Sequence, residues 1–183
     1  MGRNRAERGS HDIGGHGSAM AREYSDVDPA DYLYLSYLSR LGRAIERIGQ
    51  RHCLARYGLP FSDVRLLFAL RRAGPSHALR PTDLFRTLLV TSGAITKQVD
   101  RLVANGMVER QPDPSHGGAF LIRMTERGRE VSESAFRSLV ALYAERIRLS
   151  QRERARLAKL CEKLLADVNR FLADPAMDLD SAA

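Results

Sequence analysis

Residues 81–106, PTDLFRTLLVTSGAITKQVDRLVANG, decide the fold of this chain. They predict a short helix from Pro81 to about Leu89, because proline suits the first helical position and an aspartate in the first turn faces the positive helix end. Thr91 or Ser92 then caps a second helix, and Asn105-Gly106 ends it. The break between the helices is three to four residues long, which is short enough to swing the second helix across the first.

Longer amphipathic helices flank this pair. Apolar side chains recur every three to four positions from about Pro29 to Tyr57 and again over Phe61–Arg72, as expected of helices with one buried face. Two more helices are expected downstream, roughly over Glu126–Arg148 and Gln151–Leu172. The fold is therefore predicted to be mainly α-helical.

A short β-ribbon is expected after the second helix of the pair. Met107–Val108 and Phe120–Ile122 have the pattern of strands, and an exposed loop over residues 111–118, with two prolines and two glycines, joins them. Two helices followed by such a ribbon form the outline of a winged helix-turn-helix. The predicted fold class is thus a winged helix-turn-helix with a small β-wing and long flanking helices.

Composition limits the classes of protein to which the chain can belong. It has 183 residues, with 29 Lys and Arg against 22 Asp and Glu, a net charge of +7. The length suits one domain, or a domain with a dimerisation arm, and the positive charge makes a polyanion a candidate partner. No apolar run approaches the roughly 18 residues of a membrane span, and no hydrophobic leader follows the basic N-terminus. We therefore expect a cytoplasmic protein with no membrane partner.

Sequence motifs of catalysis and cofactor binding are missing. There is no nucleophile elbow, P-loop, dinucleotide fingerprint or His-Glu-x-x-His. Two histidines in the glycine-rich N-terminal stretch, His11 and His16, are too few for a specific metal site. We predict that the protein is not an enzyme and carries no cofactor and no metal.

The helix from Ser92 to Asn105 is expected to be the recognition helix. One side is apolar, and the opposite side is small at its N-terminal end and basic further along. Small residues let a helix end approach the major groove closely, where its positive dipole end faces phosphate. Lys97 and Arg101 on this side are predicted to reach phosphates or guanine edges.

Five blocks of sequence, in this order and spacing, resemble the MarR family of transcriptional regulators. The blocks are LRPTDL (79–84), TSGAITKQVDRL (91–102), NGMVER (105–110), DP (113–114) and RMTERG (123–128). The likeness extends from Leu33 to Leu172. It implies a homodimer that binds a pseudo-palindromic operator in double-stranded DNA, with half-sites about 10 bp apart.

The resemblance also implies a division of the chain and a set of DNA-facing residues. Residues 29–57 and 129–173 would form the dimerisation body and residues 58–128 the DNA-binding lobe. Residues 1–28 are expected to be a disordered tail and residues 174–183 a frayed acidic tail. The recognition-helix positions that match those facing DNA in the family are Ser92, Gly93, Thr96, Lys97 and Arg101.

Two departures from the family pattern affect the expected mode of binding. The wing usually carries Asp-Arg-Arg where this chain has His116-Gly117-Gly118, although Arg110 remains at the wing base. His116 is either an exposed loop histidine or a weak, pH-sensitive DNA contact. Arg80 stands where a Ser or Thr helix cap is usual, which is predicted to cost about 1 kcal/mol and to leave Arg80 available for a phosphate contact. Binding is therefore expected to be weaker, or less dependent on the minor groove, than in a typical relative.

The resemblance also implies a small effector, because many relatives release DNA when an aromatic or phenolic acid binds between the dimer body and the lobe. The candidate ligand residues here are Tyr34, Tyr37, Arg40, His52 and Arg65. Two alternatives stay open: Arg65 instead forms a salt bridge to Asp63 or to an acid on a neighbouring helix, and the tyrosines serve packing.

The function predicted from these observations is a homodimeric regulator, a repressor that occludes a promoter until a small anionic or aromatic ligand releases it. One alternative is a winged-helix module that binds a protein partner and no DNA, which the weakened wing favours. Another is a redox regulator that uses Cys53, whose neighbours Arg51 and His52 would lower its pKa. The simpler interpretation of Cys53 is an inert, buried thiol.

Overall fold

A computed structural model describes residues 23–173 of the chain. The chain forms two compact units that meet within one helix, the first ending at Leu139 and the second beginning at Val140. The two predicted tails fall largely on residues 1–22 and 174–183, which lie outside the described residues. The predicted boundaries of the lobe and the dimerisation helices stay predictions.

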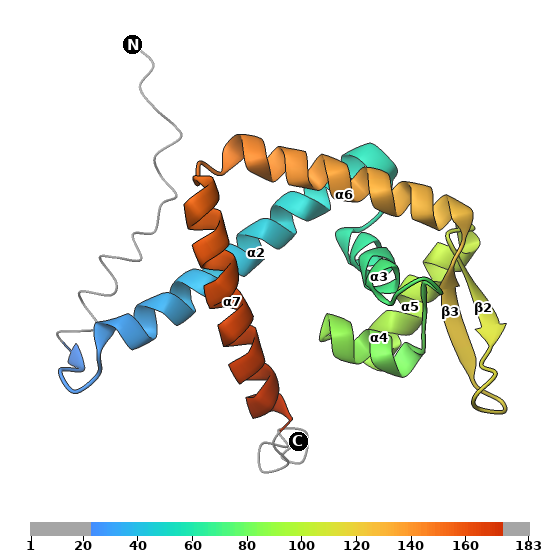
Figure 1. Cartoon of the computed structure of the whole chain (residues 1–183), viewed down its shortest axis with the longest axis horizontal. Helices are drawn as coiled ribbons and strands as arrows, with labels where there is room; N and C mark the ends of the chain where they lie inside the picture. Colours follow the sequence, from blue (N-terminus) through green and yellow to red (C-terminus); the bar gives the residue numbers. More distant parts are fainter. Residues whose placement is uncertain (1–22, 174–183) are drawn as a thin grey trace. The chain divides into compact units, whose positions relative to one another are not determined.

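The described chain is mainly helical with one small sheet, which confirms the predicted fold class (Figure 1). Its elements in order are α2 (Pro29–Tyr57), α3 (Phe61–Arg72), β1 (Ala78–Leu79), α4 (Pro81–Leu88), α5 (Ser92–Ala104), β2 (Val108–Pro112), β3 (Phe120–Met124), α6 (Glu126–Arg146) and α7 (Gln151–Leu172). We call α3, α4, α5 and the three strands the winged lobe. The helix pair with its following ribbon is therefore present as predicted.

The helix ends follow the local signals in the sequence. The Thr91 side chain caps α5 by accepting a hydrogen bond from the Ala94 N–H at 3.3 Å. Gly58, with φ of 65°, ends α2 in the left-handed conformation that glycine adopts readily. Arg80 occupies the N-cap position of α4 and makes no side-chain cap bond, as predicted. These signals act over one helical turn, so the sequence alone reveals them.

The sheet is larger than the sequence predicted. The strands run antiparallel in the order β1-β3-β2, and β2 pairs with β3 from Val108 opposite Met124 to Pro112 opposite Phe120. The predicted strands were too short because the outer part of the wing is polar and exposed and lacks a strand pattern. The sequence analysis missed β1 entirely, since its two residues become a strand only by pairing with β3.

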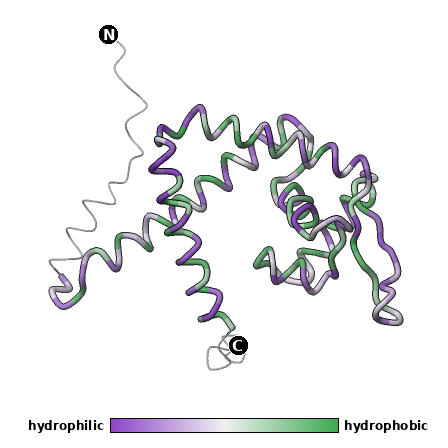
Figure 2. The backbone as a smooth tube through the Cα atoms, viewed as in Figure 1, coloured by the Kyte–Doolittle hydropathy of each residue, from purple (hydrophilic) through white to green (hydrophobic). Residues whose placement is uncertain are grey.

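The core of the first unit gathers around α3. Leu66, Leu67 and Leu70 of α3 are fully buried, together with Leu84 of α4 and Leu102 of α5. In Figure 2, green hydrophobic stretches lie along α3 and along the elements around it. Burying each leucine in this way contributes roughly 1.5–3 kcal/mol. The core therefore fixes the orientation of α5 through its contacts with α3 and α4.

The start of α6 packs closely against the base of the wing. A Cβ atom added at Gly128 would collide with the backbone carbonyl of Met107 and with the side chain of Met124. The Thr125 hydroxyl donates to the Gly106 carbonyl at 2.8 Å and accepts from the Gly128 N–H at 3.1 Å. Only glycine permits this approach, so the wing base and α6 are held together at this point.

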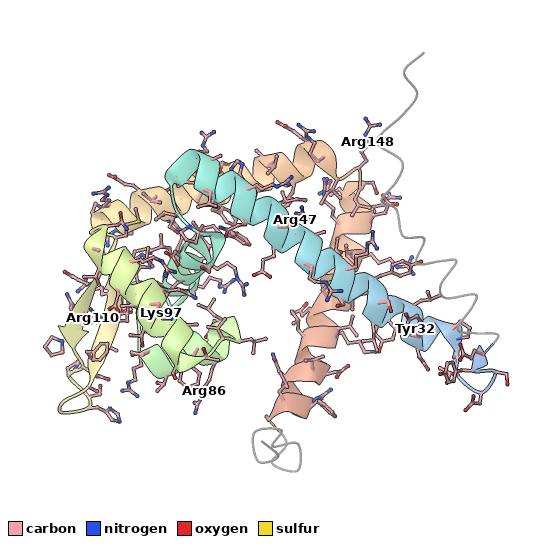
Figure 3. The ribbon with its side chains drawn as sticks, turned by 180° about the vertical axis from the view of Figure 1, so that it is seen from behind. Tyr32, Arg47, Arg86, Lys97, Arg110 and Arg148 are labelled. Atoms are coloured by element: carbon pink, nitrogen blue, oxygen red, sulfur yellow. The ribbon has the colours of Figure 1, made fainter. Side chains whose placement is uncertain are left out.

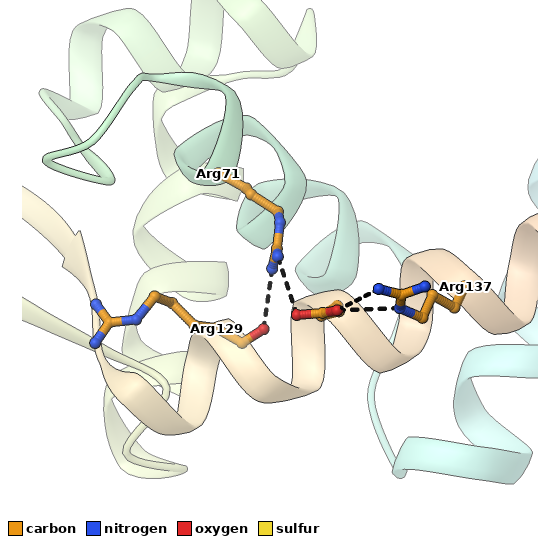
Figure 4. A network of polar contacts seen from close by, with 4 residues as sticks. Arg71, Arg129 and Arg137 are labelled. Atoms are coloured by element: carbon orange, nitrogen blue, oxygen red, sulfur yellow. Dashed lines mark hydrogen bonds and ion pairs between the residues drawn. The ribbon is translucent and has the colours of Figure 1, made fainter.

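Polar contacts also join α3 to α6 (Figure 4). Arg71 Nη1 donates to the carbonyl oxygen of Arg129 at 3.1 Å, and Arg71 Nη2 donates to Glu133 at 3.3 Å. Glu133 also accepts two hydrogen bonds from Arg137, which lowers the pKa of the Glu133 carboxyl. These side chains are substantially exposed, so they orient the helices more than they stabilise the fold.

The helix of the second unit, α7, has no buried residue. Ser150 starts it with a capping box shared with Glu153. Hydrophobic and hydrophilic segments alternate along α7 in Figure 2, and its large apolar side chains are 42–60% exposed at Leu157, Leu160, Leu165, Val168, Phe171 and Leu172. Within residues 23–173, no helix combines the length and apolar character needed to cross a membrane.

Candidate nucleic-acid interface

The exposed face of α5 is the centre of the candidate interface. Ile95, Val99 and Leu102 are buried beneath the helix, as its periodicity predicted. The opposite face exposes four of the predicted DNA-facing residues, Ser92, Gly93, Thr96 and Lys97. No atom lies within 4 Å of a Cβ built at Gly93, and the Thr96 hydroxyl donates back to the Ser92 carbonyl at 3.1 Å. The first turn therefore presents a small, unobstructed surface.

Cationic side chains without an ion pair accompany this face. Lys97 is exposed, and none of the acids between residues 23 and 173 forms a salt bridge with it. In Figure 3, Lys97 lies on α5 between the wing, which carries Arg110, and α4, which carries Arg86. Arg86 is also exposed and lacks a salt bridge within the described part of the chain. The sequence analysis missed Arg86, although its position two residues from both Leu84 and Leu88, which are buried, puts it on the opposite side of α4.

Arg110 at the wing base is anchored on two sides. Its Nη2 donates to the carboxylate of Asp100 at the outer face of α5, and its guanidinium carbon lies 5.9 Å from the centre of the Phe120 ring. The Arg110 side chain is still 40% exposed. Arg110 thus links the wing to the recognition helix, and its predicted DNA contact stays a prediction.

Arg80 connects α4 to the loop of the wing. Its Nε donates to Asp113 Oδ2 at 2.6 Å, and its Nη2 donates to His116 Nδ1 at 2.9 Å. Only 2% of the Asp113 side chain is exposed. The hydrogen bond from Arg80, followed by one from the Ser115 N–H, lowers the pKa of the Asp113 carboxyl. The sequence analysis expected Arg80 to be available for a phosphate contact. The structure shows that Arg80 binds the wing loop.

Arg101 is also engaged within the protein. Its Nε and Nη2 donate to the two carboxylate oxygens of Asp63 on α3, at 2.9 and 2.6 Å. Asp63 is fully buried, and its hydrogen bond raises the pKa of Arg101 above the usual range. The helical wheel placed Arg101 on the open face, but its long side chain turns along α5 to reach α3. The pair fixes α5 against α3, and contact of Arg101 with a base remains a prediction.

The predicted ligand residues do not form one site within a subunit. Arg65 donates to Glu46 of α2 at 2.7 Å, which is the salt bridge to a neighbouring helix that the sequence left open. The His52 ring lies 2.9 Å from the Ser138 hydroxyl. Tyr34 is 18 residues before His52 on the same helix, so about 27 Å separates them. One small molecule cannot contact both ends of this set.

The remaining members of the ligand set lie on the N-terminal half of α2. Tyr34 and Tyr37 are 43% and 47% exposed, and Arg40 is exposed beside them on the helix. This exposure suits packing against another molecule, which is the alternative that the sequence analysis kept for the tyrosines.

Cys53 occupies a position that disfavours redox sensing. The side chain is fully buried, and burial raises the pKa of its thiol. Because the thiolate is the reactive species, a raised pKa lowers reactivity at neutral pH. The predicted effect of His52 and Arg51 on this thiol is therefore wrong in sign, since burial dominates.

The sequence of the chain is similar to the sequences of known transcriptional regulators. The model of the MarR family matches residues 57–117, which cover α3 to the wing loop. The multiple antibiotic resistance protein MarR of Escherichia coli is 32% identical over 99 residues, which are 51% of this chain and 67% of that protein. The HTH-type transcriptional regulator PecS of Dickeya dadantii is 27% identical over 106 residues, which are 58% of this chain and 63% of PecS.

Solved structures of this family share the fold. Sco5413, a MarR family transcriptional regulator from Streptomyces coelicolor, has a TM-score of 0.65 at 25% identity, covering 78% of this chain and 97% of Sco5413. A mutant MarR from E. coli complexed with operator DNA has a TM-score of 0.57 at 27% identity, covering 72% and 96%. The chain therefore belongs to the MarR family, whose members are transcriptional regulators and not enzymes.

Proposed function

We propose that this protein is a homodimeric repressor that binds a pseudo-palindromic operator and blocks transcription by occupying a promoter. The observation that carries the proposal is the exposed face of α5, where Ser92, Gly93 and Lys97 form a small, cationic surface that nothing between residues 23 and 173 covers. Such a surface suits insertion into a major groove, with the wing and α4 beside the flanking phosphates. The site of action is accordingly the cytoplasm.

Exposed apolar helices support the homodimer. On α2, Leu35, Leu38 and Leu41 are 38–57% exposed, and α7 buries nothing within the described chain. An apolar surface of this extent is rarely left open to water in a monomer. A second copy is the occupant that fits, because each copy offers the same faces for a two-fold contact.

We further propose that a small anionic or aromatic ligand regulates DNA binding. The support is the contact between α2 and α3: Arg65 is paired with Glu46 there, yet the Arg65 side chain remains 38% exposed. An anionic ligand that displaced the Glu46 carboxylate would break a link between α2 and the winged lobe. The exposed rings of Tyr34 and Tyr37 would contribute only in a dimer, from another subunit.

A salt titration of DNA binding tests the proposal. The protein is titrated with DNA from upstream of its own coding region and with scrambled DNA of equal length, at several salt concentrations. An operator-binding regulator binds the first more tightly and shows a steep salt dependence. Lys97→Ala should reduce the salt slope by about one unit. Lys159→Ala is the matched control, because Lys159 is an exposed lysine on α7.

The alternative function is a winged-helix module that binds a protein partner. The observation that favours it is the wing tip, where Gly117 and Gly118 present no side chain to a groove. This alternative predicts weak and equal binding to all DNA. Weak, equal binding that Lys97→Ala leaves unchanged, including with operators selected from random DNA, would refute the regulator and favour the interaction module.

A further inference from the structure

We propose that Asp113 and His116 are positioning residues that hold Arg80 for a DNA phosphate, so that the wing binds the DNA backbone and does not read the minor groove. This inference rests on the proposed function, because it requires a sequence-specific complex with DNA. It goes beyond the α5 face by assigning a task to the loop at the end of the wing.

The first observation is a buried carboxylate at the start of the wing loop. Asp113 Oδ2 accepts from Arg80 Nε at 2.6 Å, and Oδ1 accepts from the Ser115 N–H at 2.9 Å. The side chain is 2% exposed although it sits in a loop of prolines and glycines. Both carboxylate oxygens of Asp113 therefore accept hydrogen bonds from groups within the protein.

The second observation is that the wing loop is closed upon itself. The Asp113 N–H donates to the Ala119 carbonyl at 3.0 Å, and the Ala119 N–H donates to the His116 carbonyl at 3.1 Å. The His116 N–H donates to the Asp113 carbonyl at 3.2 Å. Through Arg80, this closed loop is fixed to the N-terminus of α4.

The contact with Arg80 also selects the tautomer of a neutral His116 ring. An arginine side chain has donors and no acceptor, so the His116 Nδ1 that lies 2.9 Å from Arg80 Nη2 must accept. The ring proton of the neutral imidazole is therefore assigned to Nε2. His116 is exposed. Its Nε2–H is therefore a hydrogen-bond donor for DNA, in addition to the donors of Arg80.

Arg80 keeps donors for a ligand while it is held. Two of the five N–H groups of a guanidinium engage Asp113 and His116. The other three are available on a side chain that is 37% exposed. Arg80 is also the N-cap residue of α4, where the positive end of the helix dipole favours an anion. A phosphate oxygen is the DNA group that matches these donors.

The two glycines at the tip of the wing offer no side chain that could read a base edge. No atom lies within 4 Å of a Cβ built at Gly117 or Gly118, so both face open space. Gly118 has a φ of 79°, which disfavours replacement by other residues. The cationic donors beside this loop therefore lie on Arg80, at the start of α4, and on His116, within the loop.

The decisive test is the sign of the effect of Asp113→Asn on operator binding. Removing a negative charge near DNA normally tightens binding, whereas loss of a positioning residue weakens it. We expect weaker binding to the operator and no weakening on scrambled DNA, with a salt slope on the operator about one unit lower. Glu109→Gln is the matched control, because Glu109 is an exposed acid on β2 of the same wing. It should bind the operator at least as tightly as the wild type.

Two further variants keep the test decisive if Asp113→Asn fails to fold. Arg80→Lys preserves the charge but cannot engage Asp113 and His116 as a fork, so operator binding should weaken while thermal unfolding stays cooperative. His116→Gln, which can accept and donate at once, should bind more tightly than His116→Ala. Wild-type affinity in Arg80→Lys, or tighter binding in Asp113→Asn, would overturn the inference.

Inosine substitution tests the groove directly. Replacing G·C by I·C in the flank that faces the wing removes a minor-groove amino group and leaves the major groove and phosphates intact. We expect unchanged affinity, and a loss of about fivefold or more, the scale of a base contact, would contradict the inference. If the wild type shows no preference for any operator, the proposed function itself fails. Specific binding with unaffected variants refutes the positioning role alone.

Discussion

The buried ion pair between Asp63 and Arg101 makes a sharp prediction about the recognition helix. Both oxygens of the fully buried Asp63 carboxylate accept from Arg101, at 2.9 and 2.6 Å. Asp63→Asn keeps the shape and one acceptor, but it sets an amide NH₂ against a guanidinium N–H. Asp63→Asn thus removes the buried negative charge, whereas Arg101→Ala keeps this charge and removes its partner. The two variants should therefore differ in stability although they break the same contact.

The expected magnitudes follow from which group each variant leaves buried. A hydrogen bond to a charged group contributes about 1.5–3 kcal/mol. Arg101 is 45% exposed, so in Asp63→Asn the released guanidinium regains water and the loss should be about 1.5–2 kcal/mol. Stranding the Asp63 charge in Arg101→Ala should cost about 3–5 kcal/mol. Arg101→Ala is therefore expected to be roughly twice as destabilising.

The assay is urea unfolding at one fixed protein concentration, because the stability of a homodimer depends on concentration. Asp100→Asn is the matched control: its partner Arg110 lies at the surface, and the loss should be 0–1 kcal/mol. If Arg101→Ala costs no more than Asp63→Asn, the reasoning from burial is wrong. The same variants separate the roles of Arg101, since a base-reading Arg101 would retain operator specificity in Asp63→Asn and lose it in Arg101→Ala.

Three further predictions concern other parts of the chain. Because burial raises the pKa of the Cys53 thiol, iodoacetamide should alkylate Cys53 far more slowly in the native protein than in urea, and equal rates would contradict this. Because Arg80 lowers the pKa of Asp113 in the folded state, the stability from this pair is present above about pH 3.9 and is lost as the pH falls through the lower folded value. In urea unfolding at decreasing pH, the difference in stability between wild type and Asp113→Asn should thus shrink. A difference that persists at pH 2 would contradict this role of the Arg80–Asp113 pair. Gly128→Ala should lose about 1–3 kcal/mol because its Cβ has no space, whereas Gly93→Ala should gain up to about 1 kcal/mol in a thermal melt; the reverse order would refute the packing argument.

Local signals made the helices predictable. The apolar spacing predicted a helix over roughly Gln151–Leu172, which is the observed extent of α7. Proline at the start and a short break at the end similarly defined α4. In contrast, β1 is two residues long and exists through pairing with Arg123 and Ile122 of β3. A pattern of period two cannot appear in two residues, so the sequence could not reveal this strand.

The exposed face of α5 was predictable for the same reason, since helical periodicity decides which side of a helix is buried. The partners of the arginines were not. Arg80 meets Asp113 across 33 residues and Arg101 meets Asp63 across 38. An arginine side chain is long enough to bend away from the direction of its Cα–Cβ bond and to reach a buried acid on another element. The sequence therefore shows that positions 80 and 101 carry cations, but only the tertiary structure shows which acids these cations bind.

These pairings suggest that the cations of the interface perform two different tasks. Lys97 and Arg86 are exposed without a salt bridge in the described chain, so they are placed to neutralise phosphates of any sequence. Arg80 is already held by Asp113, so little of its side-chain entropy remains to be lost when DNA binds. Changes at Lys97 should then weaken operator and scrambled DNA alike, whereas changes at Asp113 should lower the ratio between them. Part of the specificity of this regulator would thus depend on Asp113, an acid that does not itself touch the DNA.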